Sequence, residues 1–128
     1  MLPEQHRLNR SSDFQKVVRR GKRTGRRDIV VHLVVRHDES AIVAPAGVRF
    51  GLVVSKAVGP AVTRHRVARR LRHICSSTVP VVGSDVDIVV RALPGAATAS
   101  SPELERQLMS CLRKLGAMLT VNTSDDAR

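Results

Sequence analysis

Arginines recur along one segment of the chain, and their side chains give the clearest indication of what the protein binds. No acidic residue occurs between Ser40 and Ser84, whereas this stretch contains Arg49, Lys56, Arg64, Arg66, Arg69, Arg70 and Arg72. A guanidinium group can donate two parallel hydrogen bonds to phosphate oxygens, which a lysine cannot do. The segment is therefore expected to bind a polyanion through its phosphate groups.

A second basic block lies near the N-terminus. Residues 1–28 contain three acids and nine basic residues, which are Arg7, Arg10, Lys16, Arg19, Arg20, Lys22, Arg23, Arg26 and Arg27. Over all 128 residues, 22 Lys and Arg against 11 Asp and Glu give a net charge of +11. The chain has no Trp, no Tyr and two Phe. Stacking of aromatic side chains on bases is therefore not expected to be the main source of its affinity for a nucleic acid. The composition favours a polyanion held by phosphate contacts.

The apolar residues of 61–75 predict the helix that presents these arginines. The spacing of one buried helix face, i, i+4, i+7 and i+8, is found at Val67, Leu71, Ile74 and Cys75. At about 100° per residue, the opposite side carries Arg66, Arg69 and His73, with His65 and Arg72 beside them. This spacing alone leaves open whether the basic side meets DNA, RNA or solvent.

The other elements complete a small α/β (α+β) fold. Strands are predicted at 29–35, 49–55 and 87–92, with a short pairing at 42–43 and a basic loop at 22–27. A first helix is predicted from a capping box at Ser12 to Gly21, and a last helix from a cap at Ser100. The order α-β-β-(β)-α-β-α predicts a two-layer sandwich of three helices and a mostly four-stranded sheet. One domain over 1–119 and a flexible tail at 120–128 are expected.

Motifs of protein catalysis and metal binding do not occur in the sequence. It has no His-Glu-x-x-His or Cys-x-x-Cys spacing, so no metal site in the protein alone is expected. Cys75 and Cys111 fall on apolar helix stripes and are expected to be reduced core residues. No apolar run approaches the roughly 18 residues of a membrane span and no secretory signal follows Met1, so a cytoplasmic protein without membrane contact is expected.

An ordered motif across 51–72 gives these features a more specific interpretation. It consists of Gly51-Leu52-Val53-Val54-Ser55-Lys56, Val58-Gly59, Ala61-Val62, Arg64-His65-Arg66, Arg69 and Leu71-Arg72. It is accompanied by Arg7-Leu8, Asp13-Phe14-Gln15-Lys16-Val17, Gly21 and Asp87-Ile88-Val89-Val90. Together these residues resemble the bacterial ribonuclease P protein subunit, over roughly residues 7–115.

The resemblance implies a ribosomal-protein-like fold with a left-handed βαβ crossover. The partners would be a large catalytic RNA subunit and precursor tRNA, and the protein would be monomeric in the holoenzyme. The RNA would cleave the phosphodiester bond with Mg²⁺ that it mainly holds itself, so no catalytic protein residue and no organic cofactor are implied. The protein would promote removal of the 5′ leader, which gives the mature 5′ end of the tRNA.

Site residues follow from the same resemblance. The RNA-binding residues would be Lys56, Arg64, His65, Arg66, Arg69, Arg70 and Arg72. A cleft between the first helix and the sheet would hold the single-stranded leader, lined by Phe14, Val18, His32 and Ser55. Additional basic residues near the RNA would be Lys16, Arg19, Arg20, Arg26 and Arg27.

The chain departs from the family pattern at several of these positions. His65 replaces the Asn of an Arg-Asn-Arg triplet, Ala68 replaces a Lys, and Ala57 replaces the second Lys of a Ser-Lys-Lys turn. Val18 and His32 stand at positions that are often aromatic in the family. Leader binding is therefore expected to depend more on arginine–phosphate contacts than on stacking.

Three other functions are compatible with a small basic protein. A DNA-binding regulator is disfavoured because a predicted strand, and no short helix, precedes 61–75. A protein-only nuclease is disfavoured by the lack of an acidic cluster. A ribosomal or general RNA-binding structural protein without a role in cleavage fits the fold and the charge equally well, and only the ordered motif across 51–72 argues against it.

Overall fold

A four-stranded mixed sheet forms the centre of the computed structural model, which describes residues 2–36, 47–83 and 85–118. The strands are β1 (Lys22–Gly25), β2 (Ile29–Val35), β3 (Arg49–Val53) and β4 (Val86–Ala92), in the spatial order β1-β2-β4-β3. β2 pairs antiparallel with β1 and β4, and β3 pairs parallel with β4. The helices are α1 (Ser11–Arg20), α2 (Ala61–Thr78) and α3 (Ser101–Lys114). Short 3₁₀ turns, η2 (Lys56–Val58) and η4 (Pro94–Ala97), precede α2 and α3.

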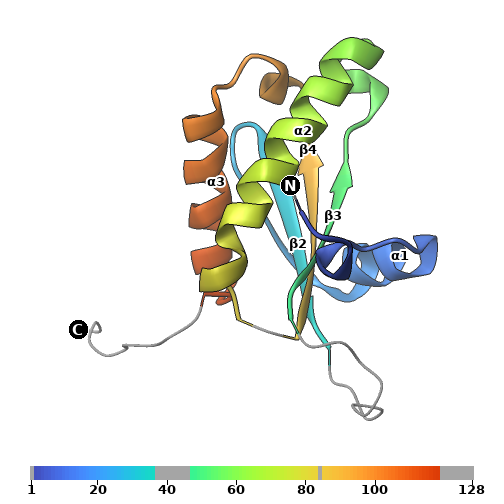
Figure 1. Cartoon of the computed structure of the whole chain (residues 1–128), viewed down its shortest axis with the longest axis vertical. Helices are drawn as coiled ribbons and strands as arrows, with labels where there is room; N and C mark the ends of the chain where they lie inside the picture. Colours follow the sequence, from blue (N-terminus) through green and yellow to red (C-terminus); the bar gives the residue numbers. More distant parts are fainter. Residues whose placement is uncertain (1, 37–46, 84, 119–128) are drawn as a thin grey trace.

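The helices lie on both faces of this sheet (Figure 1). α2 and α3 cover one face, where Val31 and Ile88 of the strands share a buried cluster with Leu71 and Leu108 of the helices. α1 crosses part of the opposite face, and a smaller cluster forms there around Val17 and Val89. Strand alternation produces this division, because successive side chains of a strand point to opposite faces.

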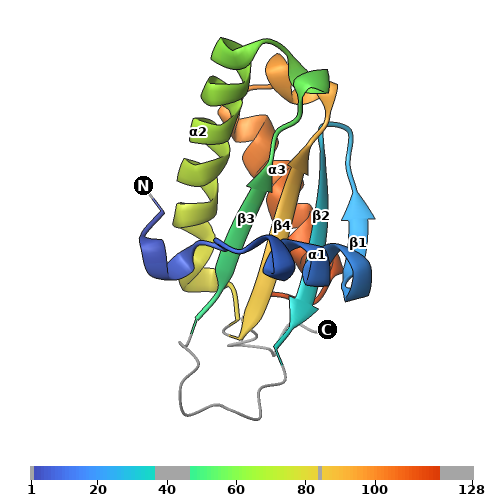
Figure 2. The same cartoon turned by 90° about the vertical axis from the view of Figure 1, so that its right-hand side faces the viewer.

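The connection from β3 through α2 to β4 is left-handed, as the resemblance implied. In Figure 2, α1 lies toward the reader, β4 stands to the right of β3, and α2 stands at the left beside β3. α2 packs with α3 on the face of the sheet that points away from α1. Parallel βαβ connections are right-handed in about 98% of cases, so the topology is unusual. α2 lies beside β3, which is an edge strand of the sheet.

The expected α+β class, with three helices and a four-stranded sheet, is confirmed. The prediction of a basic loop at 22–27 is wrong, because Lys22–Gly25 form β1. Three of the four residues of β1 are exposed and none is buried, so the strand carries no apolar alternation that a sequence pattern could show. The pairing predicted at 42–43 and the tail predicted at 120–128 lie outside the described residues.

The helix ends predicted from the sequence agree with the structure only in part. The Ser100 hydroxyl accepts a bond from the Glu103 amide at 3.2 Å, and the Glu103 carboxylate accepts one from the Ser100 amide at 2.8 Å, which confirms the cap of α3. The capping box predicted at Ser12 is wrong, because α1 begins one residue earlier and Arg10, at its cap, makes no side-chain bond. Gly21 does end α1: a Cβ there would lie 2.4 Å from a backbone oxygen of β2, so a side chain does not fit.

Candidate nucleic-acid interface

α2 is the most basic element of the described chain and contains no acidic residue. Its buried side consists of the predicted stripe of Val67, Leu71, Ile74 and Cys75, together with Thr78. An exposed ridge runs along the opposite side at i, i+4 and i+8, formed by His65, Arg69 and His73. This ridge separates two flanks of α2 whose arginines have different surroundings.

The first flank of α2 faces the segment between β4 and α3. Arg70 donates a hydrogen bond to the Ala99 carbonyl at 3.0 Å, and Arg66 donates one to the Ala97 carbonyl at 3.3 Å. These bonds hold the two guanidinium groups against the protein. Because a guanidinium has five N–H donors, both groups keep donors that a phosphate could accept from.

The second flank of α2 borders a groove along β3, which we call the β3 groove. It consists of two hollows of about 280 and 220 Å³, which adjoin because both are lined by Val54, Ala68 and Arg72. At its ends stand Arg7 and Phe14 on one side, and Arg64 and His65 on the other. The structure therefore brings Phe14, expected in the leader cleft, next to residues expected to bind the catalytic RNA.

Three further residues of the expected site lie in the segment that leads from β3 into the first turn of α2. Ser55 and Lys56 are exposed where β3 passes into η2. Arg64 in the first turn of α2 donates its Nε–H to the Gly59 carbonyl at 3.1 Å. The sharp turn at Gly59 has a φ of 154°, which a side chain rarely adopts, so glycine is required there.

The inner face of α1 rests on the sheet through Phe14, Val17 and Val18. Val17 is fully buried, whereas Phe14 and Val18 are half-buried. All three share one apolar cluster with Val89 of β4 and Val53 of β3. The two helix residues expected in the leader cleft therefore do lie together beside the sheet.

His32 lies on the α1 side of the sheet but is closed off from solvent. It is 2% exposed, and neither ring nitrogen has a hydrogen-bond partner in the described chain. Strand pairing places it opposite Arg23 of β1 and Val89 of β4. Burial, and then the positive charges of Arg91 and Arg23, lower the pKa of His32 below its ordinary value. His32 is thus a neutral, buried ring beneath the surface that it was expected to line.

Two exposed arginines on this side of the sheet, Arg23 and Arg91, were missing from the expected site. Arg23 belongs to β1, which the sequence does not predict as a strand, so its pairing with His32 is evident only in the structure. Arg91 pairs with Val30 in β2 and is the one exposed residue of β4. Its charge between Val90 and Ala92, both apolar and buried, is the sequence signal that points to it.

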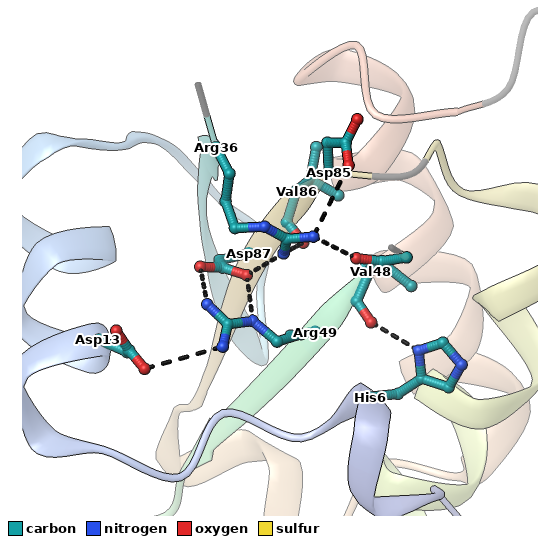
Figure 3. Close-up of polar contacts among 9 residues, drawn as sticks. His6, Asp13, Arg36, Val48, Arg49, Asp85, Val86 and Asp87 are labelled. Carbon is teal, nitrogen blue, oxygen red and sulfur yellow. Dashed lines mark hydrogen bonds and ion pairs between the residues drawn. The ribbon is translucent and has the colours of Figure 1, made fainter. Parts of the chain in front are cut away.

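A buried carboxylate, Asp87, fixes β3 to the sheet near α1 (Figure 3). Arg49 donates to its two oxygens at 2.9 and 2.8 Å, and Arg36 donates to its Oδ1 at 2.5 Å. The bond to Asp87 raises the pKa of Arg49, which also lies 3.9 Å from the Asp13 carboxylate of α1. Arg36 donates further to the Gly47 carbonyl at 2.7 Å. Arg49 belongs to the stretch without acidic residues, but its charge is neutralised by carboxylates of the protein itself.

The outer face of α1 carries three basic residues of the expected set. Lys16, Arg19 and Arg20 are exposed and line a shallow hollow of the surface. Because α1 and α2 lie on opposite faces of the sheet, these side chains form a basic surface separate from the ridge of α2.

The last two expected basic residues have partners within the protein. Arg26 donates to the Ser110 hydroxyl from Nε at 3.0 Å and from Nη2 at 2.8 Å. Arg27 lies 3.5 Å from the Asp28 carboxylate and 3.7 Å from that of Glu103. Arg26 thus holds the β1–β2 turn to α3, a role that its place in a basic run did not reveal.

The described residues offer no obvious centre for protein catalysis. No three His, Cys, Asp or Glu side chains among them come together as metal ligands. Cys75 and Cys111 are free and buried, as expected, and burial raises the pKa of both thiols. None of the described helices is long and apolar enough to cross a bilayer.

Related sequences match nearly the whole chain. The family model described as Ribonuclease P matches residues 2–116. The ribonuclease P protein component of Rhodococcus jostii (strain RHA1) is 62% identical over 124 residues, which cover 97% of this chain and 99% of the relative. That of Mycobacterium avium (strain 104) is 49% identical over 117 residues, covering 91% and 97% of the two chains.

Solved structures share the fold. The RNase P protein of Staphylococcus aureus aligns with a TM-score of 0.76 at 23% identity, over 89% of this chain and 98% of that one. The RNase P protein of Thermotoga maritima, in complex with 1-(4-fluorophenyl)-2-thiourea, aligns with a TM-score of 0.69 at 22% identity, over 81% and 94%. The family match over 2–116 and the identity to its relatives lead to one conclusion: the chain belongs to the ribonuclease P protein family.

Proposed function

We propose that one copy of this protein component of ribonuclease P binds the catalytic RNA through α2 and the 5′ leader of precursor tRNA beside α1. It would thereby promote removal of the leader in tRNA 5′ processing, in the cytoplasm where precursor tRNA is made. The observation that carries this proposal is the β3 groove, because it connects Arg64 and Arg72 of α2 with Phe14 of α1. The catalytic RNA bound at α2 and the leader bound beside α1 would therefore lie close to each other.

Hydrolysis is assigned to the RNA subunit together with Mg²⁺. The buried carboxylates among the described residues, Asp28 and Asp87, do not fit a magnesium site, because Asp87 is bonded to two arginines and Asp28 accepts a bond from Gln107 at 2.7 Å. Mg²⁺ prefers carboxylate oxygens and phosphate oxygens that are free to coordinate. The RNA supplies such phosphates in abundance, so we place the metal there.

The protein's own part is to neutralise and position phosphates. Arg69 is exposed on the ridge of α2, and Arg66 and Arg70 are oriented by their carbonyl contacts. Contacts of this kind place a backbone without reading its sequence, so preference for a leader sequence should be weak. If roughly 6–10 phosphates are neutralised, affinity should fall steeply as salt rises, because counterions are released on binding.

A reconstitution assay tests the function. Precursor tRNA is incubated at near-physiological Mg²⁺ with the protein, with the cognate RNA subunit, and with both. Cleavage at the mature 5′ end is expected only in the mixture. Cleavage by the protein alone, or unchanged RNA activity in its presence, would contradict the proposal and favour a nuclease or a purely structural RNA-binding protein.

A further inference from the structure

A hollow at one end of the sheet lies apart from the β3 groove. It has a volume of about 510 Å³ and is lined by the last residues of β2, the first residue of β4, and the C-terminal ends of α1 and α3. It shares no lining residue with the two hollows of the β3 groove. A ligand of this hollow, which we call the end hollow, would therefore be distinct from one that lies in the β3 groove.

The floor of the end hollow is apolar and open to solvent. Val35 is 48% exposed, and it is one of three large apolar side chains that are exposed in the described part of the chain. Val34 and Leu115, which also line the hollow, are half-buried. Covering such apolar surface removes it from water and is favourable, so the floor suits apolar side chains.

Two cations without partners stand at the rim of the end hollow. Arg20 ends α1 and Lys22 begins β1, and both are exposed. Neither makes a hydrogen bond or an ion pair with another residue that the structure describes. Arg26 and Arg27, further along the chain, instead contact a hydroxyl and carboxylates of the protein. The rim therefore favours an occupant that brings carboxylates.

The sequence of residues 119–128, which lie outside the described part of the chain, contains both kinds of side chain. Two apolar residues near its start are followed by two adjacent acids, and these four residues are Leu119, Val121, Asp125 and Asp126. The one basic residue of this segment, Arg128, comes after the acids. This composition complements a hollow with an apolar floor and a basic rim.

The described part of the chain leads directly to this segment from the end hollow. Gly116 lines the hollow, and Met118, two residues later, pairs with Val82. An extended chain spans at most about 3.3–3.6 Å per residue, so residues 119–125 can reach about 25 Å from that point. A site joined to its ligand by a short linker meets it at an effective concentration in about the millimolar range. This favours the chain's own segment over a second copy in dilute solution.

We propose that residues 119–126 of the same chain cover the end hollow. The two apolar side chains of this segment would lie on Val35 and Leu115, and its two acids would meet Arg20 and Lys22. The segment would thereby act as an internal competitor that keeps RNA phosphates away from the end of α1. The inference goes beyond the proposed function and does not depend on it, because the β3 groove takes no part in it.

A spin label on the segment tests its position in the full chain. The variant Ala127→Cys carries the label next to the two acids, while the two native cysteines are buried. The amide signal of Val35 should lose more intensity than that of Val81, which adjoins the partner of Met118 but does not line the end hollow. An equal or larger loss at Val81, as for the flexible tail expected from the sequence, would overturn the proposal. Wild-type protein treated with the same reagent is the control.

Two charge-matched double variants test the rim. Arg20→Glu with Lys22→Glu reverses both rim charges, whereas Lys16→Glu with Arg19→Glu makes the same change of net charge at exposed positions of α1 that do not line the end hollow. The first pair should abolish the additional loss of intensity at Val35, and the second pair should preserve it. Equal effects of the two pairs would overturn the proposal, because they would reflect net charge alone.

A mixing experiment separates contact within one chain from contact between copies. Isotope-labelled wild-type protein is mixed with unlabelled protein that carries the spin label at Ala127→Cys. The signal of Val35 should keep its full intensity in this mixture. A loss at Val35 in the mixture would assign the end hollow to the segment of a second copy and overturn the proposal.

Neutralising the two acids should open the end of α1 to RNA. Asp125→Asn with Asp126→Asn should strengthen binding to an unstructured RNA oligonucleotide, and the slope of log affinity against log salt should steepen by about one to two. Glu4→Gln with Glu105→Gln makes the same change of net charge at exposed positions outside the end hollow, and its slope should stay that of the wild type. Equal slopes of the two double variants would overturn the proposed competition.

Discussion

The ring of Phe14 occupies the space that a side chain at Gly51 would need. A Cβ on Gly51 would lie 2.5 Å from both Cε2 and Cζ of that ring, and 3.2 Å from the Cβ of Leu8. Phe14 belongs to α1 and Gly51 to β3, so this contact sets how closely the helix approaches the sheet. The same ring lines the β3 groove, and the position of α1 is thereby linked to the shape of the candidate site.

Replacing Gly51 by alanine should displace the Phe14 ring. Overpacking of this kind costs about 1–3 kcal/mol, so the free energy of unfolding should fall by that amount in a urea titration. Binding of precursor tRNA by the reconstituted holoenzyme should weaken as well. Gly25→Ala is the matched control, because its Cβ would meet its nearest neighbour at an ordinary 3.6 Å. Equal stabilities of the two variants would contradict the packing argument.

The buried ring of His32 should make stability depend on pH. Its pKa is lowered in the folded protein, first by burial and then by Arg91 and Arg23. Below about pH 6.5 the unfolded chain takes up a proton that the folded protein does not, so stability is retained above that pH and lost as the pH falls toward the folded pKa. Urea titrations at pH 7.5, 6.5 and 5.5 should show this loss in the wild type and a smaller one in His32→Phe.

Exposed His73 provides the control for that experiment. The variant His73→Gln should keep the full loss of stability on acidification, because its ring is not buried in the fold. A His32→Phe protein with the same pH dependence as the wild type would show that other groups cause the effect.

Substitutions of two neighbouring arginines of α2 should have different effects, one on the stability of the fold and the other on RNA binding. Arg70→Ala loses the bond to the Ala99 carbonyl and should reduce the free energy of unfolding by about 1 kcal/mol. Arg69→Ala removes an exposed side chain and should change stability by less than about 0.5 kcal/mol. It should instead weaken binding to the catalytic RNA and reduce the slope of log affinity against log salt by about one. An unchanged slope for Arg69→Ala would remove this residue from the interface.

Neutralising Asp87 should be far more damaging than neutralising its neighbour. Asp87→Asn leaves the charges of Arg36 and Arg49 without their buried partner, and a broken buried pair costs about 3–5 kcal/mol. Asp85, whose side chain is 64% exposed, lies 3.9 Å from Arg36, and Asp85→Asn should cost less than about 0.5 kcal/mol. Thermal unfolding of the two variants compares them directly. Similar melting temperatures would mean that the Asp87 contacts are not important for the fold.

Local patterns in the sequence predicted the elements that carry a strong periodic signal. The stripe Val67, Leu71, Ile74 and Cys75 is the buried side of α2, and the cap at Ser100 begins α3 as expected. β1 escaped prediction because a polar edge strand is held by hydrogen bonds to its neighbour and buries almost nothing of its own. The ordered motif across 51–72 identified the family without any knowledge of these contacts.

The sequence by itself determined the helix faces, the buried strands and the total positive charge, since each depends on residues close together in the chain. Only the tertiary structure decided which charges remain available to RNA. Arg26 and Arg49 look like members of a basic surface, but Ser110 and Asp87 bind them from positions 84 and 38 residues away. Arg72 instead opens onto a groove shared with Phe14 of another helix. These differences arise from contacts between distant segments, which spacing along the chain cannot encode.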